Sequence, residues 1–323
     1  MSVRRLFACA ALLLTAGVAA ATAQEWPAKT VQVISFLGPG NANDAIARVV
    51  LEQTFRQMNA TYVIENRPGA GGTIGVNSVA KADPDGYTLL LNSSTLSSQV
   101  VLHKSLPFDP VRDLQPIALF GIQPSVLVST PSRGFKTVAD LVAAAKAKPG
   151  SLNFASAGLG SASHMAAERF RNAAKLDVQH VPFNSPGQAL SEVIAGRIDY
   201  YYLPLAAAAP LLKDGKLTLL AVSTPERAPQ LPDVPTIVEA GYPDAKYLFW
   251  SGIAGPAKLP KPIVDKLHAE VEKALQTADV KDKLYTLGLK PQLMSVADFT
   301  KFAQDDVAST IKLAKDINLN PPN

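Results

Sequence analysis

The sequence predicts an α/β protein with two sheets, each mainly parallel and flanked by helices. Short β-branched stretches alternate with amphipathic helical stretches along almost the whole chain, and that order is typical of parallel sheets covered on both faces. About 300 residues remain after an N-terminal leader, enough for two domains of ordinary size. In such sheets ligands bind beyond the carboxyl ends of the strands, so turns that follow strands are the candidate sites.

The elements are marked by their boundary residues. Capping boxes at residues 137–140 and 185–188 predict two helix starts, the second with Pro186 at the first helical position. Glycines at 150, 196 and 215 end helices. The expected strands span residues 31–35, 62–65, 87–91, 152–156, 178–183, 198–202 and 217–222. Other helices are expected at residues 72–81 and 161–176, and two apolar stripes near the C-terminus, one from Ile263 to Leu275 and one from Phe299 to Ile311, predict two more.

Residues 1–23 have the pattern of a signal peptide. Arg4 and Arg5 precede an apolar run, and small residues lead to an expected cleavage near Ala23. We therefore expect export to the periplasm. Cys9 is the only cysteine and precedes most of the apolar run, whereas a lipoprotein acceptor would follow it, so we expect no lipid anchor. The mature chain then has no thiol for disulfides, metal binding or nucleophilic catalysis.

The charge balance gives little indication of a partner. Without Arg4 and Arg5, 29 basic and 27 acidic side chains remain. There is no Lys/Arg-rich run and no basic stripe with interleaved aromatic residues, so we expect no nucleic acid partner.

The first candidate site follows the strand at residues 31–35. Gly38, Pro39, Gly40, Asn41 and Asn43 form a turn, and Asp44 is expected to open a helix. A turn of this kind leaves backbone N–H groups at the positive end of a helix dipole, which is a site for an anion. It contains no Lys or Arg, so amides and Asn side chains would hold the anion. The alternative is a tight connection that binds nothing.

A second turn repeats this pattern after the strand at residues 152–156. Its residues 157–164 contain Gly158, Gly160, Ser161 and Ser163, again without a basic side chain, and they open a helix. Gly158 and Gly160 begin a G-x-G pattern, but Ser163 stands where a dinucleotide fingerprint needs glycine or alanine. Residues 69–71 also begin a G-x-G pattern, but Ile74 stands where the fingerprint needs glycine or alanine. We therefore expect no nucleotide and no other cofactor.

Taken together and in order, the motifs of the chain resemble one family over nearly the whole mature sequence: the periplasmic solute receptors of tripartite tricarboxylate transporters, often called Bug receptors. The residues that carry the resemblance are Pro39, Gly40, Asp44, Ala47 and Arg48; residues 65–72, 84–88 and 156–158; Gly160, Ser161 and His164; residues 180–182, 231–236 and 239–241; and Trp250.

This resemblance implies a two-lobed, type II-like periplasmic binding protein with its ligand in the cleft between the lobes. Residues 24–123 and 249–323 would form the first lobe and residues 124–248 the second, with the C-terminal helices packed on the first. The ligand would be a small di-, tri- or aromatic carboxylic acid, delivered to integral membrane transporter subunits by a monomeric receptor. The ligand-binding residues would be Phe36, Gly38, Pro39, Gly40, Asn41, Ala42, Asn43, Ser93, Ser94, Ala157, Gly158, Gly160, Ser161, His164, Phe183, Asp199 and Tyr200.

Two departures from the family pattern bear on the ligand. The first turn reads Gly40-Asn41-Ala42-Asn43-Asp44 where the family usually has two glycines and Ser or Thr, and it has one extra residue before Pro39. Asn41 and Asn43 could therefore donate amide hydrogen bonds. In residues 182–185, Phe183 and Asn184 replace the usual tyrosine and lysine.

Several of these residues have a structural alternative. Asp44 is expected to stabilise its helix N-terminus rather than contact a carboxylate, which it would repel. His164 is expected to hydrogen-bond the turn, because no other histidine has metal-ligand spacing with it. Ser93 and Ser94 either line the cleft or shape a turn. Period two places Tyr200 and Tyr202 on one face of their strand and Tyr201 on the other, so some of them are core residues.

Two rival functions remain. An exported serine hydrolase could use Ser161 and His164, but the chain lacks a G-x-S-x-G elbow and the zinc-protease and phosphate-loop motifs, so we expect no enzyme and no metal site. A ligand sensor that signals to a membrane kinase is compatible with the same fold.

Overall fold

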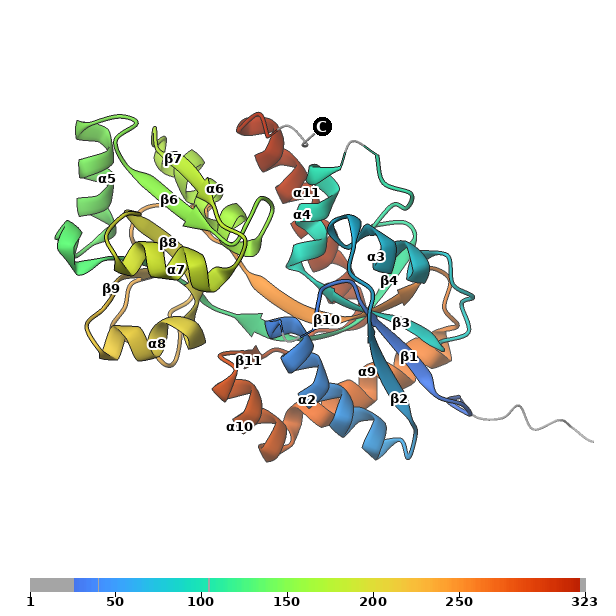
Figure 1. Cartoon of the computed structure of the whole chain (residues 1–323). Coiled ribbons are helices and arrows are strands. Elements are labelled where there is room, and N and C mark those ends of the chain that lie inside the picture. Colours follow the sequence, from blue (N-terminus) through green and yellow to red (C-terminus); the bar gives the residue numbers. More distant parts are fainter. Residues whose placement is uncertain (1–25, 40, 104, 320–323) are drawn as a thin grey trace, which may run out of the picture.

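The computed structural model describes residues 26–39, 41–103 and 105–319, and the chain folds into two α/β lobes (Figure 1). Lobe 1 is built on a six-stranded sheet and lobe 2 on a five-stranded sheet. The predicted α/β fold with two sheets is therefore confirmed. The predicted signal peptide and Gly40 lie outside the described residues.

The lobe 1 sheet has the strand order β11-β4-β10-β3-β1-β2. β1 pairs in parallel with β2 and β3, whereas β10 is antiparallel to β3 and β4, and β11 is antiparallel to β4. The strands are β1 (Val31–Ser35), β2 (Tyr62–Asn66), β3 (Thr88–Ser93), β4 (Leu114–Gln123), β10 (Phe249–Pro256) and β11 (Lys290–Pro291).

Helices cover both faces of this sheet. Val31 and Val33 of β1 share one apolar cluster with the helices of one face, whereas Ile34 belongs to the cluster on the other, as the alternation of a strand requires. The first face carries α2 (Ala42–Gln57), α9 (Lys261–Gln276) and α10 (Ala278–Thr286), and the second carries α3 (Thr73–Ala80) and α4 (Ser94–Leu102). The turn after β1 and the direct step from β3 into α4 are thus held between packed elements.

The lobe 2 sheet has the order β7-β6-β8-β5-β9. β6 pairs in parallel with β7 and β8, and β5 is antiparallel to β8 and β9. The strands are β5 (Ser125–Ser129), β6 (Asn153–Ser156), β7 (Gln179–Pro182), β8 (Tyr200–Pro204) and β9 (Thr218–Val222).

The three tyrosines of β8 show how the lobe 2 core is divided. Tyr200 and Tyr202 pack with α5 (Val138–Ala147) and α6 (Ala162–Ala174). Tyr201 packs on the other face with α7 (Pro186–Ile194) and α8 (Leu205–Lys213). The expected alternation is confirmed, and all three rings are buried.

Both sheets are mixed, so the expectation of mainly parallel sheets is corrected. The chain leaves lobe 1 along β4, enters lobe 2 directly along β5, and returns along β10 (Figure 1). β10 lies between β4 and β3, and β5 lies between β8 and β9, each antiparallel to both neighbours. Because β4 carries the chain out of lobe 1 and β10 brings it back within the same sheet, these two strands run in opposite directions.

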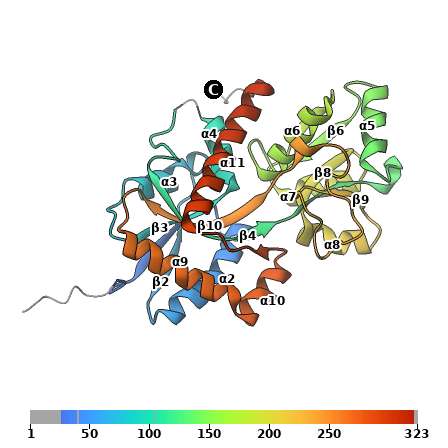
Figure 2. The same cartoon turned by 180° about the vertical axis from the view of Figure 1, so that it is seen from behind.

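The last helix, α11 (Val296–Asp316), contacts both lobes. Phe299 packs with Trp250 of lobe 1, whereas Leu313 belongs to the apolar core of lobe 2. Arg169 of α6 donates hydrogen bonds to Ser309 (3.0 Å) and Thr310 (3.2 Å) of this helix. In Figure 2, which shows the molecule from behind, α11 lies in front and beside α4. α9 and α10 thus pack on the lobe 1 sheet, whereas α11 packs on both lobes.

Two element boundaries differ from expectation in ways that matter for the site. α2 begins at Ala42, with Asn41 as its N-cap, rather than at Asp44. β8 begins at Tyr200, two residues later than expected. Within the described part of the chain, no helix has the length and apolar character needed to cross a membrane.

Candidate functional site

The first turn connects β1 to α2 and is stabilised by its own side chains. Asn41 accepts a hydrogen bond from the Asp44 N–H (3.1 Å) and donates one to the Gly38 carbonyl. Both polar ends of the Asn41 side chain therefore make a hydrogen bond within the turn, and its second Nδ2 hydrogen leaves donation to a ligand a prediction. Asp44 is buried and ion-paired with Arg48 (3.1 Å), which agrees with its expected structural role.

Asn43 and Ser93 form the part of lobe 1 that is best equipped to bind an anion. Asn43 is buried and its Oδ1 accepts a hydrogen bond from Ser251, which lies opposite Ser93 in the β10–β3 pair. Asn43 Nδ2 and Ser93 Oγ are both buried and have no hydrogen-bond partner among the described residues. Buried donors without partners are rare in folded proteins, and they mark a place where a ligand or water is bound. Ser93 is also the N-cap of α4, but its hydroxyl makes no capping bond.

Ser94, the other serine singled out at the end of β3, faces lobe 2. Its hydroxyl accepts a hydrogen bond from Tyr247 Oη at 3.5 Å. Tyr247 belongs to the lobe 2 core, so this long hydrogen bond joins the lobes close to Ser93. Burial raises the pKa of Tyr247, which therefore stays protonated and can donate.

The lobe 2 turn after β6 is also internally bonded. The N–H groups of Ala157, Gly158 and Gly160 donate to Ser163 Oγ (3.0 Å), Ser156 Oγ (3.2 Å) and His164 Nδ1 (3.1 Å). The Ser161 N–H donates to the Gly158 carbonyl, and the Ser161 hydroxyl caps α6.

The N–H groups of Ala157, Gly158, Gly160 and Ser161 are therefore occupied. The N–H groups of Leu159, Ala162 and Ser163 make no hydrogen bond within the described residues. They leave the first turn of α6 with free donors at the positive end of its dipole.

A buried polar network supports this turn. His164 accepts from the Gly160 amide through Nδ1, so its Nε2 carries the proton that faces Glu168 at 3.6 Å. This confirms the expected hydrogen bond from His164 to the turn. His180 stacks on His164 with ring centroids 4.1 Å apart, and its Nε2 lies 2.6 Å from Ser156 Oγ.

The charges of this network are set by burial and by their neighbours. Burial, with a smaller contribution from the neighbouring His164, lowers the pKa of His180 to about 4, so it is neutral near pH 7. Burial would raise the pKa of Glu168, but the hydrogen bond with His164 and the Arg171 charge at 2.7 Å lower it below its usual value. The negative charge of the Glu168 carboxylate is therefore balanced by its partners His164 and Arg171.

The network also excludes a catalytic pair of Ser161 with His164, the pair expected for a hydrolase. A catalytic serine needs its hydroxyl within hydrogen-bond reach of a free imidazole nitrogen. Ser161 Oγ instead accepts from the His164 backbone N–H (3.3 Å) and pairs with Ser163 Oγ (3.0 Å), while both ring nitrogens of His164 face Gly160 and Glu168.

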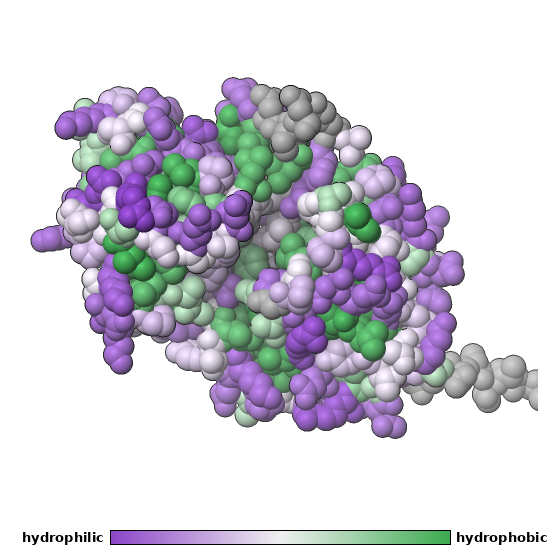
Figure 3. Space-filling model, in the orientation of Figure 1, coloured by the Kyte–Doolittle hydropathy of each residue, from purple (hydrophilic) through white to green (hydrophobic). Residues whose placement is uncertain are grey.

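The lobe 2 turn touches lobe 1. A Cβ atom added to Gly160 would lie 2.9 Å from Cγ of Leu102, at the end of α4, and closer still to its Cδ1. Gly160 also has φ +71°, which favours glycine. Figure 3 shows the surface hollowed between the two lobes, on the face that Figure 1 presents.

Asp199 and Tyr200 lie away from both turns, and their assignment to the site is corrected. β8 is parallel to β6, and Phe154 of β6 pairs with Tyr200, so Tyr200 lies toward the amino end of β6 and the turn follows the other end. Asp199 is paired with Arg133 (2.8 Å) and accepts from the Asn153 N–H. Tyr201, which was not among the expected site residues, shares a hydrogen bond with Ser163.

The remaining expected residues are placed around the turns. Phe36 is buried and its ring fills the space beside Gly72, so it supports the first turn from behind. Pro39 and Ala42 are exposed, and Gly38 is partly exposed. Phe183 packs at the edge of the α7–α8 cluster, with its carbonyl facing Gly158.

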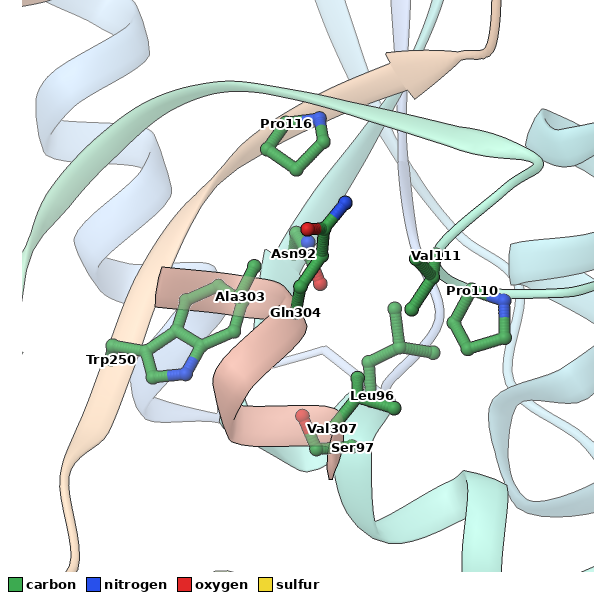
Figure 4. A pocket seen from close by; sticks show the side chains of 10 residues that line it. All are labelled: Asn92, Leu96, Ser97, Pro110, Val111, Pro116, Trp250, Ala303, Gln304 and Val307. Carbon is green, nitrogen blue, oxygen red and sulfur yellow. The ribbon is translucent and has the colours of Figure 1, made fainter. Parts of the chain in front are cut away.

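Three cavities lie outside this site. The pocket in Figure 4, between α11 and the lobe 1 sheet, has a volume of about 20 Å³, so it holds no more than a water molecule. A pocket of about 440 Å³ lies at the connection between the lobes, around Pro124, Leu248 and Phe302. A groove of about 800 Å³ lies between α6 and α11 and is lined by Arg169 and Tyr247. In the described ranges, no cluster of three His, Asp or Glu side chains could hold a metal ion.

Comparison with known sequences identifies relatives along most of the chain. The family model described as "Tripartite tricarboxylate transporter family receptor" matches residues 46–319. A protein of Pseudomonas sp. strain P51, described as a UPF0065 protein in the tcbD-tcbE intergenic region, is 36% identical, with 89% of this chain and 86% of that protein covered. Protein BugT of Bordetella pertussis is 31% identical, with 95% of each chain covered.

Solved structures share the fold. A structure described as a periplasmic transporter has a TM-score of 0.78 at 30% identity and covers 91% of this chain and 99% of its own. Rpa4515 of R. palustris with adipate has a TM-score of 0.79 at 29% identity, covering 92% and 100%. MatC of Rhodopseudomonas palustris with bound malate has a TM-score of 0.75 at 31% identity, covering 89% and 99%.

Sequence motifs, fold and relatives agree. The chain belongs to the tripartite tricarboxylate transporter receptor family, whose members are periplasmic solute-binding proteins and not enzymes.

Proposed function

We propose that this protein is a monomeric periplasmic receptor that binds a small carboxylic acid between its two lobes and delivers it to the membrane subunits of a tripartite transporter. Export would depend on a signal peptide cleaved near Ala23. Family membership supports the transport role, and the adipate and malate bound to two related structures support a carboxylate ligand.

The observation that carries the proposal is the set of donors without partners at the helix starts. Asn43 Nδ2 lies at the start of α2 and Ser93 Oγ at the start of α4, and both are buried. The first turn of α6 adds free N–H groups from lobe 2. We infer that the carboxylate accepts hydrogen bonds from both sets, so that its binding draws the lobes together. Each charge-assisted hydrogen bond contributes roughly 1.5–3 kcal/mol, and each helix end roughly 0.3–1 kcal/mol.

We also propose that residues 24–123 with 249–323 and residues 124–248 move as two bodies. The strands of each sheet come from one of these sets. The connections at Pro124 and near Leu248 would then be the hinges, and α11 would slide or tilt against lobe 2 when the cleft opens. Domain closure around a ligand by a few hinge residues is a common mechanism.

The test is a thermal-shift screen of the purified protein with mono-, di- and tricarboxylic acids, followed by calorimetry with the tightest ligand. A ligand at a hundred times its dissociation constant adds about 2.7 kcal/mol of stability, a shift of several degrees. We expect Asn43→Ala and Ser93→Ala each to weaken binding about 10-fold, since each removes one charge-assisted hydrogen bond.

Asn41→Ala is the matched control in the same turn. Because Asn41 caps α2 and bonds only within the turn, this change should cost about 1 kcal/mol of stability and affect affinity less than Asn43→Ala. The proposal would be wrong if no carboxylate bound, or if a bound acid were insensitive to both Asn43→Ala and Ser93→Ala.

A further inference from the structure

The glycine that follows Leu159 in the lobe 2 turn is bound to an imidazole. The Gly160 N–H donates to His164 Nδ1 at 3.1 Å, and the His164 side chain is buried. Its other nitrogen, Nε2, faces Glu168, whose carboxylate is held by Arg171 at 2.7 Å. Because an ionised carboxylate can only accept, it keeps the proton of His164 on Nε2 and leaves Nδ1 to accept from Gly160.

The glycine that precedes Leu159 is bound to a second imidazole through Ser156. The Gly158 N–H donates to Ser156 Oγ at 3.2 Å, and this oxygen lies 2.6 Å from His180 Nε2. The Ser156 hydroxyl can donate to His180 or to the Gly158 carbonyl at 3.1 Å, and His180 then accepts or donates accordingly. In both arrangements the imidazole fixes Ser156 Oγ, and Ser156 Oγ fixes the Gly158 N–H.

The two imidazole rings also fix each other. His164 and His180 stack with ring centroids 4.1 Å and planes 23° apart, and His180 stacks on Phe154 of β6 with centroids 4.9 Å apart. Stacked rings in a close-packed interior have little room to turn. The groups that bind the two glycines are therefore held on rigid side chains.

Polar rings at these two positions are unfavourable for stability alone. His164 and Phe154 are buried, and burial lowers the pKa of His180 to about 4. An apolar side chain of similar size would pack against Phe154 without the cost of removing ring nitrogens from water. The two imidazoles are better explained by the hydrogen bonds that they make, and those bonds lead to N–H groups of the lobe 2 turn.

We propose that His164 and His180 are positioning residues for ligand binding: they hold the N–H groups of Gly160 and Gly158 so that the Leu159 N–H stays free for the carboxylate. This inference rests on the proposed function, because it takes the Leu159 N–H as one of the lobe 2 donors. Neither ring contacts the ligand, and both act through the backbone. Without these two rings the glycine N–H groups need other acceptors, and a Gly-Leu-Gly segment is permissive enough to rearrange and find them.

The experiment pairs a substitution that removes each ring nitrogen with one that keeps a polar group in its place. His164→Leu is paired with His164→Asn, whose amide oxygen can occupy the position of Nδ1. His180→Leu is paired with His180→Gln, whose amide group can reach the position of Nε2. Calorimetry with the tightest acid of the screen should show binding weakened about 10-fold or more by each Leu variant, but at most about 3-fold by His164→Asn and His180→Gln.

Phe170→Leu is the control for a loss of core packing alone. Phe170 is a fully buried residue of α6, and its ring contacts Tyr200, Tyr202 and Tyr242. Urea unfolding should show a lower stability for Phe170→Leu. Its affinity for the acid should equal that of the unmodified protein, so affinity and stability together distinguish a positioning role from a packing role.

Nitrogen-15 NMR spectra of the histidine rings test the inference in the unmodified protein, without relying on a variant that folds. We expect His164 to carry its proton on Nε2 and not on Nδ1, with a scalar coupling across the hydrogen bond between Nδ1 and the Gly160 amide nitrogen. In His164→Asn the Gly160 N–H should stay protected from hydrogen exchange, because an acceptor is kept.

The outcomes separate this inference from the proposed function. If both Leu variants bind the acid as tightly as the unmodified protein while Asn43→Ala still weakens binding, the inference is overturned and the proposed function stands. A proton on His164 Nδ1, or equal weakening by a Leu variant and its polar counterpart, would also overturn the inference. If no carboxylate of the screen binds to the unmodified protein, the proposed function itself is refuted.

Discussion

Gly160→Ala tests whether the contact between the lobe 2 turn and α4 belongs to the ligand-bound form. Gly160 has φ +71°, so a Cβ atom there costs roughly 1–2 kcal/mol of backbone strain. The same Cβ would overlap Leu102, and displacing a packed side chain costs about 1–3 kcal/mol more. The displacement of Leu102 is needed only when the lobes are in contact. Gly160→Ala should therefore weaken ligand binding about 10-fold or more.

Gly134→Ala is the matched control. Gly134 has φ +73°, but a Cβ atom there would meet nothing within 4 Å, so only the backbone strain applies. Urea unfolding should give a similar loss of stability for both variants, whereas calorimetry with the tightest acid of the screen should show weaker binding for Gly160→Ala alone. Adding Leu102→Ala to Gly160→Ala should restore affinity. If Gly160→Ala binds as tightly as Gly134→Ala, the Leu102–Gly160 contact plays no part in ligand binding.

Three further predictions concern stability and the joint between the lobes. Thr137→Ala removes half of the capping box of α5 and should lower the free energy of unfolding in urea by about 1 kcal/mol. Ligand affinity should not change, because α5 takes no part in the site; a loss of affinity would contradict this. His180 has a pKa of about 4 in the folded protein and 6.5 in the unfolded chain, so the unfolded chain binds the proton first as the pH falls. The free energy of unfolding should therefore be unchanged above pH 6.5 and decrease by on the order of 1–3 kcal/mol between pH 6.5 and 4. Unfolding measured across that range should show a smaller decrease for His180→Gln. Arg169→Met removes the hydrogen bonds to Ser309 and Thr310, so proteolysis or hydrogen exchange should show α11 loosened; unchanged protection of α11 would show that these bonds do not hold it to lobe 2.

Local signals in the sequence predicted the elements that they directly control. The capping residues Thr137 and Ser185 and the glycines after helices fixed the helix boundaries of lobe 2 closely, and the two glycine-bearing turns are found after β1 and β6 as expected. The crossing strands β4 and β10 were missed as strands because Pro116 and Gly121 in one and Gly252 and Gly255 in the other interrupt their apolar pattern. Their pairing depends on contacts between residues more than a hundred positions apart, which no local pattern encodes.

The errors at the site have the same origin. Asp199 was assigned to the cleft because its strand was expected to span residues 198–202, but the strand begins at Tyr200 and runs parallel to β6, which puts Asp199 at the far end. From the sequence, Asn41 and Asn43 are equally good candidates for an amide donor in the first turn. Only the helix boundary shows that one caps α2 while the other reaches Ser251 and keeps a free donor. No local sequence pattern marks Leu102 or Tyr247 as a site residue, because each contributes only through a contact with the other lobe.

The most direct test of a carboxylate held without a salt bridge is a crystal structure of the protein with the tightest acid of the screen. We expect the carboxylate oxygens within 2.7–3.2 Å of Asn43 Nδ2, Ser93 Oγ and at least one N–H group of residues 159–163, with no Lys or Arg nitrogen within 4 Å. An acid bound in the groove beside Arg169, or a carboxylate paired with a Lys or Arg side chain, would contradict this account.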